Sequence, residues 1–257
     1  MTGSIVFSDF SQFATQILKQ RDNRFFLFDI FIFIYSVAIR LLYLITYPMP
    51  VRDSYTYKQY IIQLIEHDFP ESKYIPPVGL YILKAPADFF NVDPIVCGTV
   101  LNVVLGVLII IFGLRAFGEI CKSFICYCCM GLIIASHPSL ISFSCQLSRE
   151  NLYLLFCILS AYNCIRAIKT RNLFFFALTA VFSAMAFLCR FEGLEIVFFF
   201  ALALFFYLRR IKDVLEKLLI FLVVYLATIF VVVVGIIGLP FAYFLNLFLF
   251  KFSLKFI

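Results

Sequence analysis

The chain has 257 residues, of which 64% are hydrophobic and only 14% are charged, and its mean hydropathy is +1.03. A soluble domain of this length carries about 25% charged residues, so the composition excludes an ordinary water-soluble protein. The net charge of +6 does not indicate a nucleic-acid partner, because the basic residues gather in short clusters between apolar runs, as in the loops of membrane proteins.

Nine cysteines and two histidines raise the question of a metal site. Most of the cysteines lie inside apolar runs, where a free thiol behaves as a small hydrophobic side chain, and no pair has the spacing of a zinc site. The sequence therefore predicts no metal ligands and no cofactor, although it leaves a catalytic divalent metal open.

The apolar runs predict an all-α fold, a polytopic transmembrane helical bundle of about seven spans. Segment 1–24 is polar and amphipathic and lacks the features of a cleavable signal peptide, so we expect a cytoplasmic N-terminus followed by an uncleaved anchor. The transmembrane module is expected over residues 25–240, and segment 241–257 is either an interfacial helix or a truncated eighth span. The predicted spans are 25–47, 95–114, 120–136, a run ending at 165, 173–189, 193–208 and 218–237.

The first long loop, residues 48–94, contains an amphipathic stretch. Its apolar residues follow the i, i+3, i+4, i+7, i+8 spacing of one helix face, and after a Pro-Pro pair a second short apolar segment follows. We expect these two segments to form helices that lie in the membrane interface. The residues of the stripe are Tyr57, Tyr60, Ile61, Leu64 and Ile65.

The fourth run is too short to span as it stands, because a span needs about 20 residues at a rise of about 1.5 Å each. The sequence therefore predicts that its helix begins near Ser139 and carries Arg149 and Glu150 into the outer part of the bilayer. The fifth and sixth runs are joined only by Arg190, Phe191 and Glu192, which predicts a tight hairpin.

Positive charge follows alternate spans, which predicts that those loops are cytoplasmic. The opposite loops then bring three separate pieces of chain to one outer face. They carry Asp53, the pair at 149–150, and the charged turn at 190–192.

Each of these charged residues has an ordinary interpretation beside the functional one. Asp53 could be a solvated loop carboxylate, but its place between a span and an interfacial helix suits a general base that meets a lipid-borne substrate. Arg149 and Glu150 could form a structural ion pair with the 190–192 turn, or they could bind substrate, because ionisable groups at membrane depth commonly mark functional sites. Arg190 and Glu192 could be plain loop charges, but Arg suits phosphate binding.

Two further charges, Asp29 and Arg40, lie about three turns apart on one face of the first span. We interpret them as structural residues that point into the bundle.

Several short motifs resemble the GT-C glycosyltransferases, membrane enzymes that use polyprenyl-phosphate sugars and include protein mannosyltransferases and aminoarabinose transferases. The resemblance covers about residues 40–194 and rests on the order of the motifs. They are RLLY at 40–43, RDSY at 52–55, YIPPVGLY at 74–81, HPSL at 137–140, QLSRENL at 146–152 and LCRFEGL at 188–194.

The resemblance implies an inverting transfer of sugar from a dolichyl or undecaprenyl phosphate to a lipid, glycan or protein acceptor on the extracytoplasmic face. Asp53 matches the acidic residue of the first outer loop, which acts as a base or orients the acceptor. Arg149 and Arg190 would hold the departing phosphate, and Glu150 and Glu192 would orient those arginines or bind sugar hydroxyls. Arg52, Tyr55 and Tyr57 flank Asp53 and complete the candidate substrate-binding set. A bacterial plasma membrane is favoured over the endoplasmic reticulum.

Members of that family usually have more spans and often a soluble outer domain. The sequence is close to the shared N-terminal membrane module alone, so three alternatives stay open: a fragment, a minimal member of the family, or one half of a two-part enzyme whose second subunit supplies the remaining part. Two other functions also remain open: a transporter or lipid-translocating module, and a catalytically silent subunit that binds lipid-linked sugar.

Overall fold

The computed structural model describes residues 23–47, 52–66, 77–207 and 211–238. All regular secondary structure in these ranges is helical, which confirms the predicted all-α class. Nearly all of segment 1–24 and the whole of segment 241–257 lie outside the described residues, so the structure does not bear on the predictions made for them.

Four helices are long and apolar enough to cross a membrane, and a fifth candidate is a bent pair. The bend of 52° falls at His137, because Pro138 disfavours a helical conformation in the residue before it. The four are α2 (Asn23–Thr46), α5 (Pro94–Ile120), α8 (Glu150–Thr170), and α11 (Ile211–Phe230) with the π-helical turn η2 (Val231–Ile236); the bent pair is α6 (Phe124–Ser136) and α7 (Pro138–Ser144).

Two further apolar helices, α9 (Leu173–Cys189) and α10 (Leu194–Tyr207), have only 17 and 14 residues. A straight span needs about 20 residues. By length and composition the described chain therefore has four or five candidate spans, whereas the sequence predicted about seven, and the difference lies in these short helices and in the bent pair.

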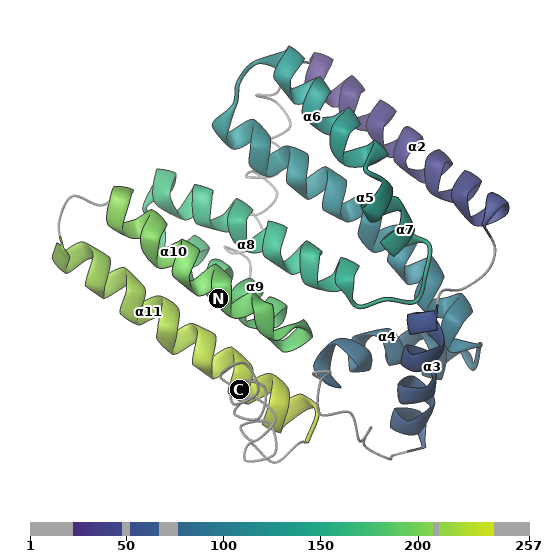
Figure 1. Ribbon diagram of the computed structural model, residues 1–257. Coiled ribbons are helices and arrows are strands. Elements are labelled where there is room, and N and C mark those ends of the chain that lie inside the picture. The colour runs from purple at the N-terminus through teal and green to yellow at the C-terminus, as the bar shows by residue number, and fades with distance from the viewer. Residues whose placement is uncertain (1–22, 48–51, 67–76, 208–210, 239–257) are drawn as a thin grey trace, which may run out of the picture.

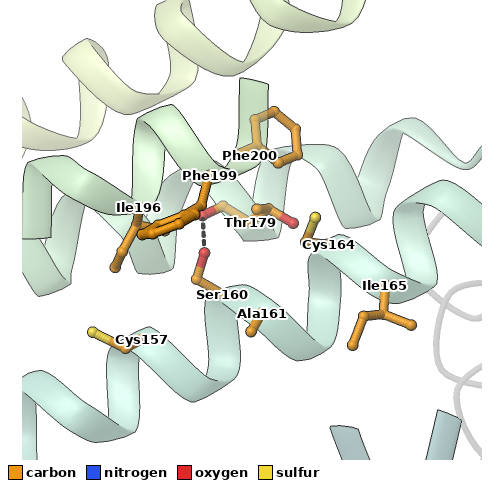
Figure 2. Close-up of a pocket in the computed structure, with 9 residues that line it drawn as sticks. All are labelled: Cys157, Ser160, Ala161, Cys164, Ile165, Thr179, Ile196, Phe199 and Phe200. Atoms are coloured by element: carbon orange, nitrogen blue, oxygen red, sulfur yellow. Dashed lines mark hydrogen bonds between the residues drawn. The ribbon is translucent and has the colours of Figure 1, made fainter. Parts of the chain in front are cut away.

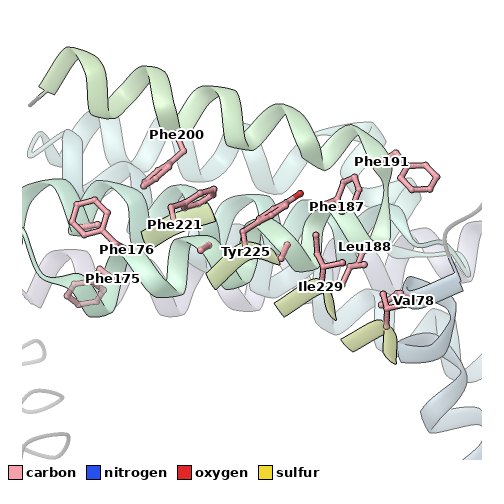
Figure 3. Close-up of a cluster of buried hydrophobic side chains, with 14 of the residues drawn as sticks. Val78, Phe175, Phe176, Phe187, Leu188, Phe191, Phe200, Phe221, Tyr225 and Ile229 are labelled. Atoms are coloured by element: carbon pink, nitrogen blue, oxygen red, sulfur yellow. The ribbon is translucent and has the colours of Figure 1, made fainter. Parts of the chain in front are cut away.

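The helices form two groups joined by α5 and α8 (Figure 1). On one side α2 packs against α5 and α6, and on the other α9 packs against α8 and α11. The second group is built around stacked aromatic rings, with Phe200 and Phe221 centroids 4.2 Å apart and Tyr225 continuing the stack (Figure 3). Large apolar side chains also cover the outer faces of α2, α10 and α11, where they are more than one-third exposed. Exposed apolar surface of this extent suits a lipid environment and not water.

The fourth predicted span begins later than expected. The prediction placed its start near Ser139, but α8 begins at Glu150, and residues 138–144 form the separate short helix α7. The helix nevertheless reaches 21 residues, because it extends at its C-terminal end past Ile165 to Thr170 and not at its N-terminal end as predicted. Arg149 consequently caps α8 and does not lie within it.

The long first loop contains the two predicted helices, α3 (Arg52–Ile65) and α4 (Pro77–Phe90). The apolar stripe of α3 packs within the protein: Tyr57, Ile61 and Leu64 are buried against Leu80 and Leu83 of α4. This pair lies at one end of α5, beside the start of that helix (Figure 1).

The two charges of the first span occupy different surroundings. Asp29 accepts a hydrogen bond of 2.7 Å from the Tyr127 hydroxyl and lies 3.6 Å from the guanidinium of Arg115, so it joins α2 to α6 and α5. Arg40 is fully buried, and its Nη1 donates to the Ser36 carbonyl at 3.1 Å. Both side chains thus point into the bundle, as the structural interpretation expects.

Candidate functional site

The candidate site gathers where a bend delivers the start of α8 to the side of α3. Residues 145–149 connect α7 to α8 without helical structure (Figure 1); Arg149 is the last of them, and Glu150 is the first residue of α8. Glu150 occupies the first turn of α8, where the free N–H groups of the helix favour a negative charge.

Arg149 is the most buried charged group of the site, with 8% of its surface exposed. Its Nη1 donates to the Cys189 carbonyl at 3.3 Å, at the end of α9. Within the described residues its Nε has no hydrogen-bond partner and no carboxylate forms an ion pair with it. Burying a guanidinium is costly unless its charge is compensated, so this group is suited to receive an anion.

Arg190 lies in a different electrostatic environment. Its Nη1 is 3.0 Å from the Glu150 carboxylate and its Nε is 3.4 Å from that of Glu192. Its guanidinium also lies 5.7 Å from the centre of the Tyr153 ring, within the range of a cation–π contact. Two carboxylates therefore neutralise one cation, and the structural ion pair expected as the ordinary interpretation of these residues is present.

The turn that holds Arg190 is a single 3₁₀ turn, η1 (Phe191–Gly193). Gly193 is needed there because a Cβ atom would sit 2.4 Å from the Phe187 nitrogen. The predicted tight hairpin between α9 and α10 is therefore confirmed, and its closeness explains how Arg190 and Glu192 reach the same ion pair.

Tyr57 links α3 to this group. Burial raises the pKa of the Tyr57 phenol, the nearby charge of Glu150 raises it further, and the Arg149 guanidinium beside the hydroxyl opposes the rise. The charge of Asp53, one turn earlier on α3, also acts on Tyr57. Asp53 itself is exposed to solvent. The arrangement places a free carboxylate near a buried, incompletely paired arginine.

Two of the predicted site residues stand apart. Tyr55 is 54% exposed, and its position two residues before Tyr57 turns it to another face of α3. Arg52 begins α3, but its side chain lies outside the described residues. The structure thus groups Tyr57, Arg149, Glu150, Arg190 and Glu192 in one region with Asp53 at its edge.

Sequence reasoning missed several residues of this region. Tyr153 and Cys189 contact the two arginines, and Ser54 and Asn102 bind the bend from α3 and α5. A lone Asn in the middle of an apolar run is a detectable signal for Asn102. Nothing in the local sequence marks Cys189, whose carbonyl and not its thiol makes the contact.

An apolar pocket lies farther along α8, between α8, α9 and α10 (Figure 2). It has a volume of about 330 Å³. Its hydroxyl groups are already satisfied: Ser160 bonds to Ser183 at 2.8 Å, and Thr179 donates to the Phe175 carbonyl at 2.8 Å. With no free polar group on its wall, the pocket suits a hydrocarbon chain.

Within the described part of the chain, no group of three His, Cys, Asp or Glu side chains is arranged to hold a metal ion. All nine cysteines are free thiols.

Comparison with protein-family models, with curated proteins and with solved structures gives no match to this chain.

Proposed function

We propose that the chain is an integral membrane glycosyltransferase that moves a sugar from a polyprenyl phosphate to an acceptor on the extracytoplasmic face. The observation that carries the proposal is the buried Arg149 guanidinium, with an unpartnered Nε, beside the α3 helix that bears Asp53. The motif resemblance supplies the reaction class. In this proposal α6 with α7, α9 and α10 also cross the bilayer, which gives seven spans and a cytoplasmic N-terminus.

The reaction needs one base and one anion-stabilising group. Asp53 takes the proton of the acceptor hydroxyl, whose oxygen attacks the anomeric carbon of the sugar from the face opposite the phosphate. The bond between that carbon and the phosphate oxygen breaks, and its electron pair leaves with the phosphate. A preorganised cation beside the developing negative charge lowers the barrier, and this role falls to Arg149.

The two arginines take different roles in this proposal. Arg190 is already neutralised by Glu150 and Glu192, so it has less attraction left for a phosphate than Arg149 has. We assign Arg190 to hold Glu150 and Glu192 in place, where their remaining oxygens can accept hydrogen bonds from sugar hydroxyls. Tyr57 stays protonated at neutral pH, since burial raises its pKa, and can donate to the phosphate.

A lipid-linked donor also fits the surroundings of the site. The apolar pocket along α8 begins at Cys157, one helical turn after Tyr153. The ring of Tyr153 makes the cation–π contact with Arg190, so the pocket starts close to the charged region. The hydrocarbon chain of a polyprenyl phosphate can bind in such an apolar pocket, while its phosphate group stays near the charged residues at the start of α8.

The test uses the purified full chain in lipid nanodiscs with radiolabelled polyprenyl-phosphate hexoses and pentoses. We expect release of polyprenyl phosphate, reduced at least about 100-fold by Asp53→Asn and by Arg149→Gln. Asp88→Asn is the matched control, because Asp88 is also a partly exposed carboxylate on an outer-loop helix but lies away from the site.

Each outcome separates two alternatives. Undiminished transfer by Asp53→Asn overturns its assignment as the base. Donor binding that is weakened by Arg149→Gln, with no transfer by the wild type, favours a silent lipid-binding subunit over an enzyme.

A further inference from the structure

The bend that carries Arg149 has no regular structure of its own to hold it. Residues 145–149 lie between two helices, and within this segment only the Arg149 carbonyl is known to accept a helical hydrogen bond, from the Tyr153 N–H of α8 at 3.1 Å. Three successive carbonyls, those of Gln146, Leu147 and Ser148, nevertheless all accept hydrogen bonds from side chains of other elements.

Asn102, in the middle of α5, supplies two of these bonds. Its side-chain amide donates to the Gln146 and Ser148 carbonyls, each at 2.8 Å, so both N–H groups of one amide are used on the bend. Asn102 is fully buried, and its main-chain carbonyl accepts a hydrogen bond of 3.1 Å from the Asn151 side-chain amide in the first turn of α8. It is therefore bonded to both sides of Arg149.

Ser54 supplies the third bond from α3. Its hydroxyl donates to the Leu147 carbonyl at 3.2 Å and is fully buried. Ser54 is the neighbour of Asp53 in the sequence, so this bond joins the base-bearing helix to the bend two residues before Arg149. The Leu147 side chain strengthens the contact, because it is buried in the same cluster as Tyr57 and Ile61.

We propose that Ser54 and Asn102 are positioning residues that fix Arg149 relative to Asp53 by holding residues 145–149. Both are small polar side chains whose hydrogen-bond donors bind the backbone of one segment. Neither is among the residues proposed above to contact the substrate. In its catalytic consequence this inference rests on the proposed function, but its geometric part does not.

The geometry is tested by fluorine NMR on the full chain in nanodiscs with 3-fluorotyrosine at position 57. Arg149→Gln provides the resonance position of a Tyr57 ring that has lost the guanidinium beside it. We expect Ser54→Ala and Asn102→Ala to move the resonance toward that position. Ser54→Cys, with a weaker donor of similar size, should give a smaller shift.

Two matched controls separate positioning from a general loss of buried hydrogen bonds. Ser183→Ala removes a fully buried hydroxyl that bonds to the Thr179 carbonyl and to Ser160, none of them in residues 145–149, and Asn163→Ala removes a buried amide that bonds within α8. Both should leave the Tyr57 resonance at its wild-type position.

The catalytic part is read as a split between kcat and KM with the donor used above. We expect Ser54→Ala to lower kcat about tenfold with a KM close to that of the wild type, because a misplaced leaving-group cation acts mainly on the transition state. A resonance unchanged in both Ser54→Ala and Asn102→Ala overturns the positioning role even if the chain is a transferase. A shifted resonance in a chain that turns over no donor keeps the positioning role and removes the proposed function.

Discussion

Arg190 lies 3.0 Å from Glu150 across 40 residues of sequence, and this contact joins the start of α8 to the turn between α9 and α10. The two side chains are 29% and 19% exposed, so the pair is shielded from water more than an ordinary surface salt bridge. Because Glu192 contacts the same guanidinium, the pair belongs to a network with two acceptors and one donor.

That imbalance predicts unequal effects of removing its members. Glu150→Gln leaves Arg190 paired with Glu192 and should lower the free energy of unfolding by about 1 kcal/mol. Arg190→Gln removes the cation that Glu150 and Glu192 share and should cost about 2–3 kcal/mol. The measurement is reversible unfolding in mixed micelles, with Lys217→Gln as a control at about 0.5 kcal/mol or less, because its partner Glu216 is 62% exposed. Equal losses for the two variants would show that Glu192 does not share the cation.

The turn itself should tolerate no side chain at Gly193. A Cβ atom there would lie 2.4 Å from the Phe187 nitrogen and 2.6 Å from the Ala186 carbonyl carbon, which are backbone atoms of a packed helix. We expect Gly193→Ala to cost about 3 kcal/mol or more in unfolding free energy.

The matched control is Gly113→Ala in α5, where the nearest atom would be the end of the Ile134 side chain at 3.7 Å. Alanine favours a helix over glycine by about 1 kcal/mol, so this variant should be as stable as the wild type or more so. A Gly193→Ala protein that unfolds like the wild type would contradict the geometry of the hairpin.

The sequence predicted the elements of this fold better than it predicted their ends. Apolar length and periodicity located α2, α5, α9 and the stripe of α3, because burial and lipid exposure act on every residue of a helix. The start of α8 was predicted wrongly, since α7 ends at Ser144 and side chains of α3 and α5 bind the carbonyls of residues 146–148, which keeps those residues outside both helices. The hydrogen bonds from Asn102 to residues 146 and 148 join distant parts of the chain, so they produce no periodic pattern in the sequence near either partner.

The site shows the same division. Charges near predicted membrane edges located Arg149, Glu150, Arg190 and Glu192, because such residues are rare in an apolar chain. Which carboxylate pairs with which arginine depends on the closeness of the hairpin and on the bend before α8, and sequence alone supplies neither. The sequence analysis therefore assigned phosphate binding to both arginines, whereas in the structure two carboxylates already neutralise the charge of Arg190.

Acid should weaken the attachment of α3 to α5. Lys58 pairs with Asp93, and this hydrogen bond holds the pKa of the Asp93 carboxyl below its usual 3.8. At a pH between the lowered pKa and the usual one, the folded state therefore binds fewer protons than the unfolded state. The contribution of the Asp93–Lys58 pair to the free energy of unfolding is complete above about pH 4 and is lost as the pH falls through the lowered pKa. The measurement is the unfolding free energy between pH 6 and about pH 2.

The variant Asp93→Asn isolates this ion pair. Its side-chain oxygen can still cap α5 by accepting from the Ile95 N–H, as Asp93 does at 2.8 Å, so the cap is kept while the charge and the hydrogen bond from Lys58 are lost. We expect Asp93→Asn to remove this acid-dependent contribution and Lys58→Met to remove the larger part of it, because the backbone N–H groups of Ile95 and Val96 also lower the pKa of Asp93. If both keep the full acid dependence of the wild type, another carboxylate is responsible.

Side-selective labelling should place the two ends of α8 on opposite sides of the membrane. Asp93 and Lys58 meet at the start of α5, whereas Glu119, near its end, pairs with Lys169 near the end of α8 at 3.1 Å. The two helices therefore run in the same direction, and Arg166, Lys169 and Arg171 gather at the end that the positive-inside rule predicts to be cytoplasmic. Gln59→Cys on the exposed face of α3 should react with a membrane-impermeant maleimide in intact cells, and Thr170→Cys only after permeabilisation.

The wild-type chain with its nine native thiols sets the background labelling against which both variants are compared. Labelling of both positions from one side would remove α8 as a span, and a reversed pattern would put Asp53 in the cytoplasm and remove the extracytoplasmic transfer with it.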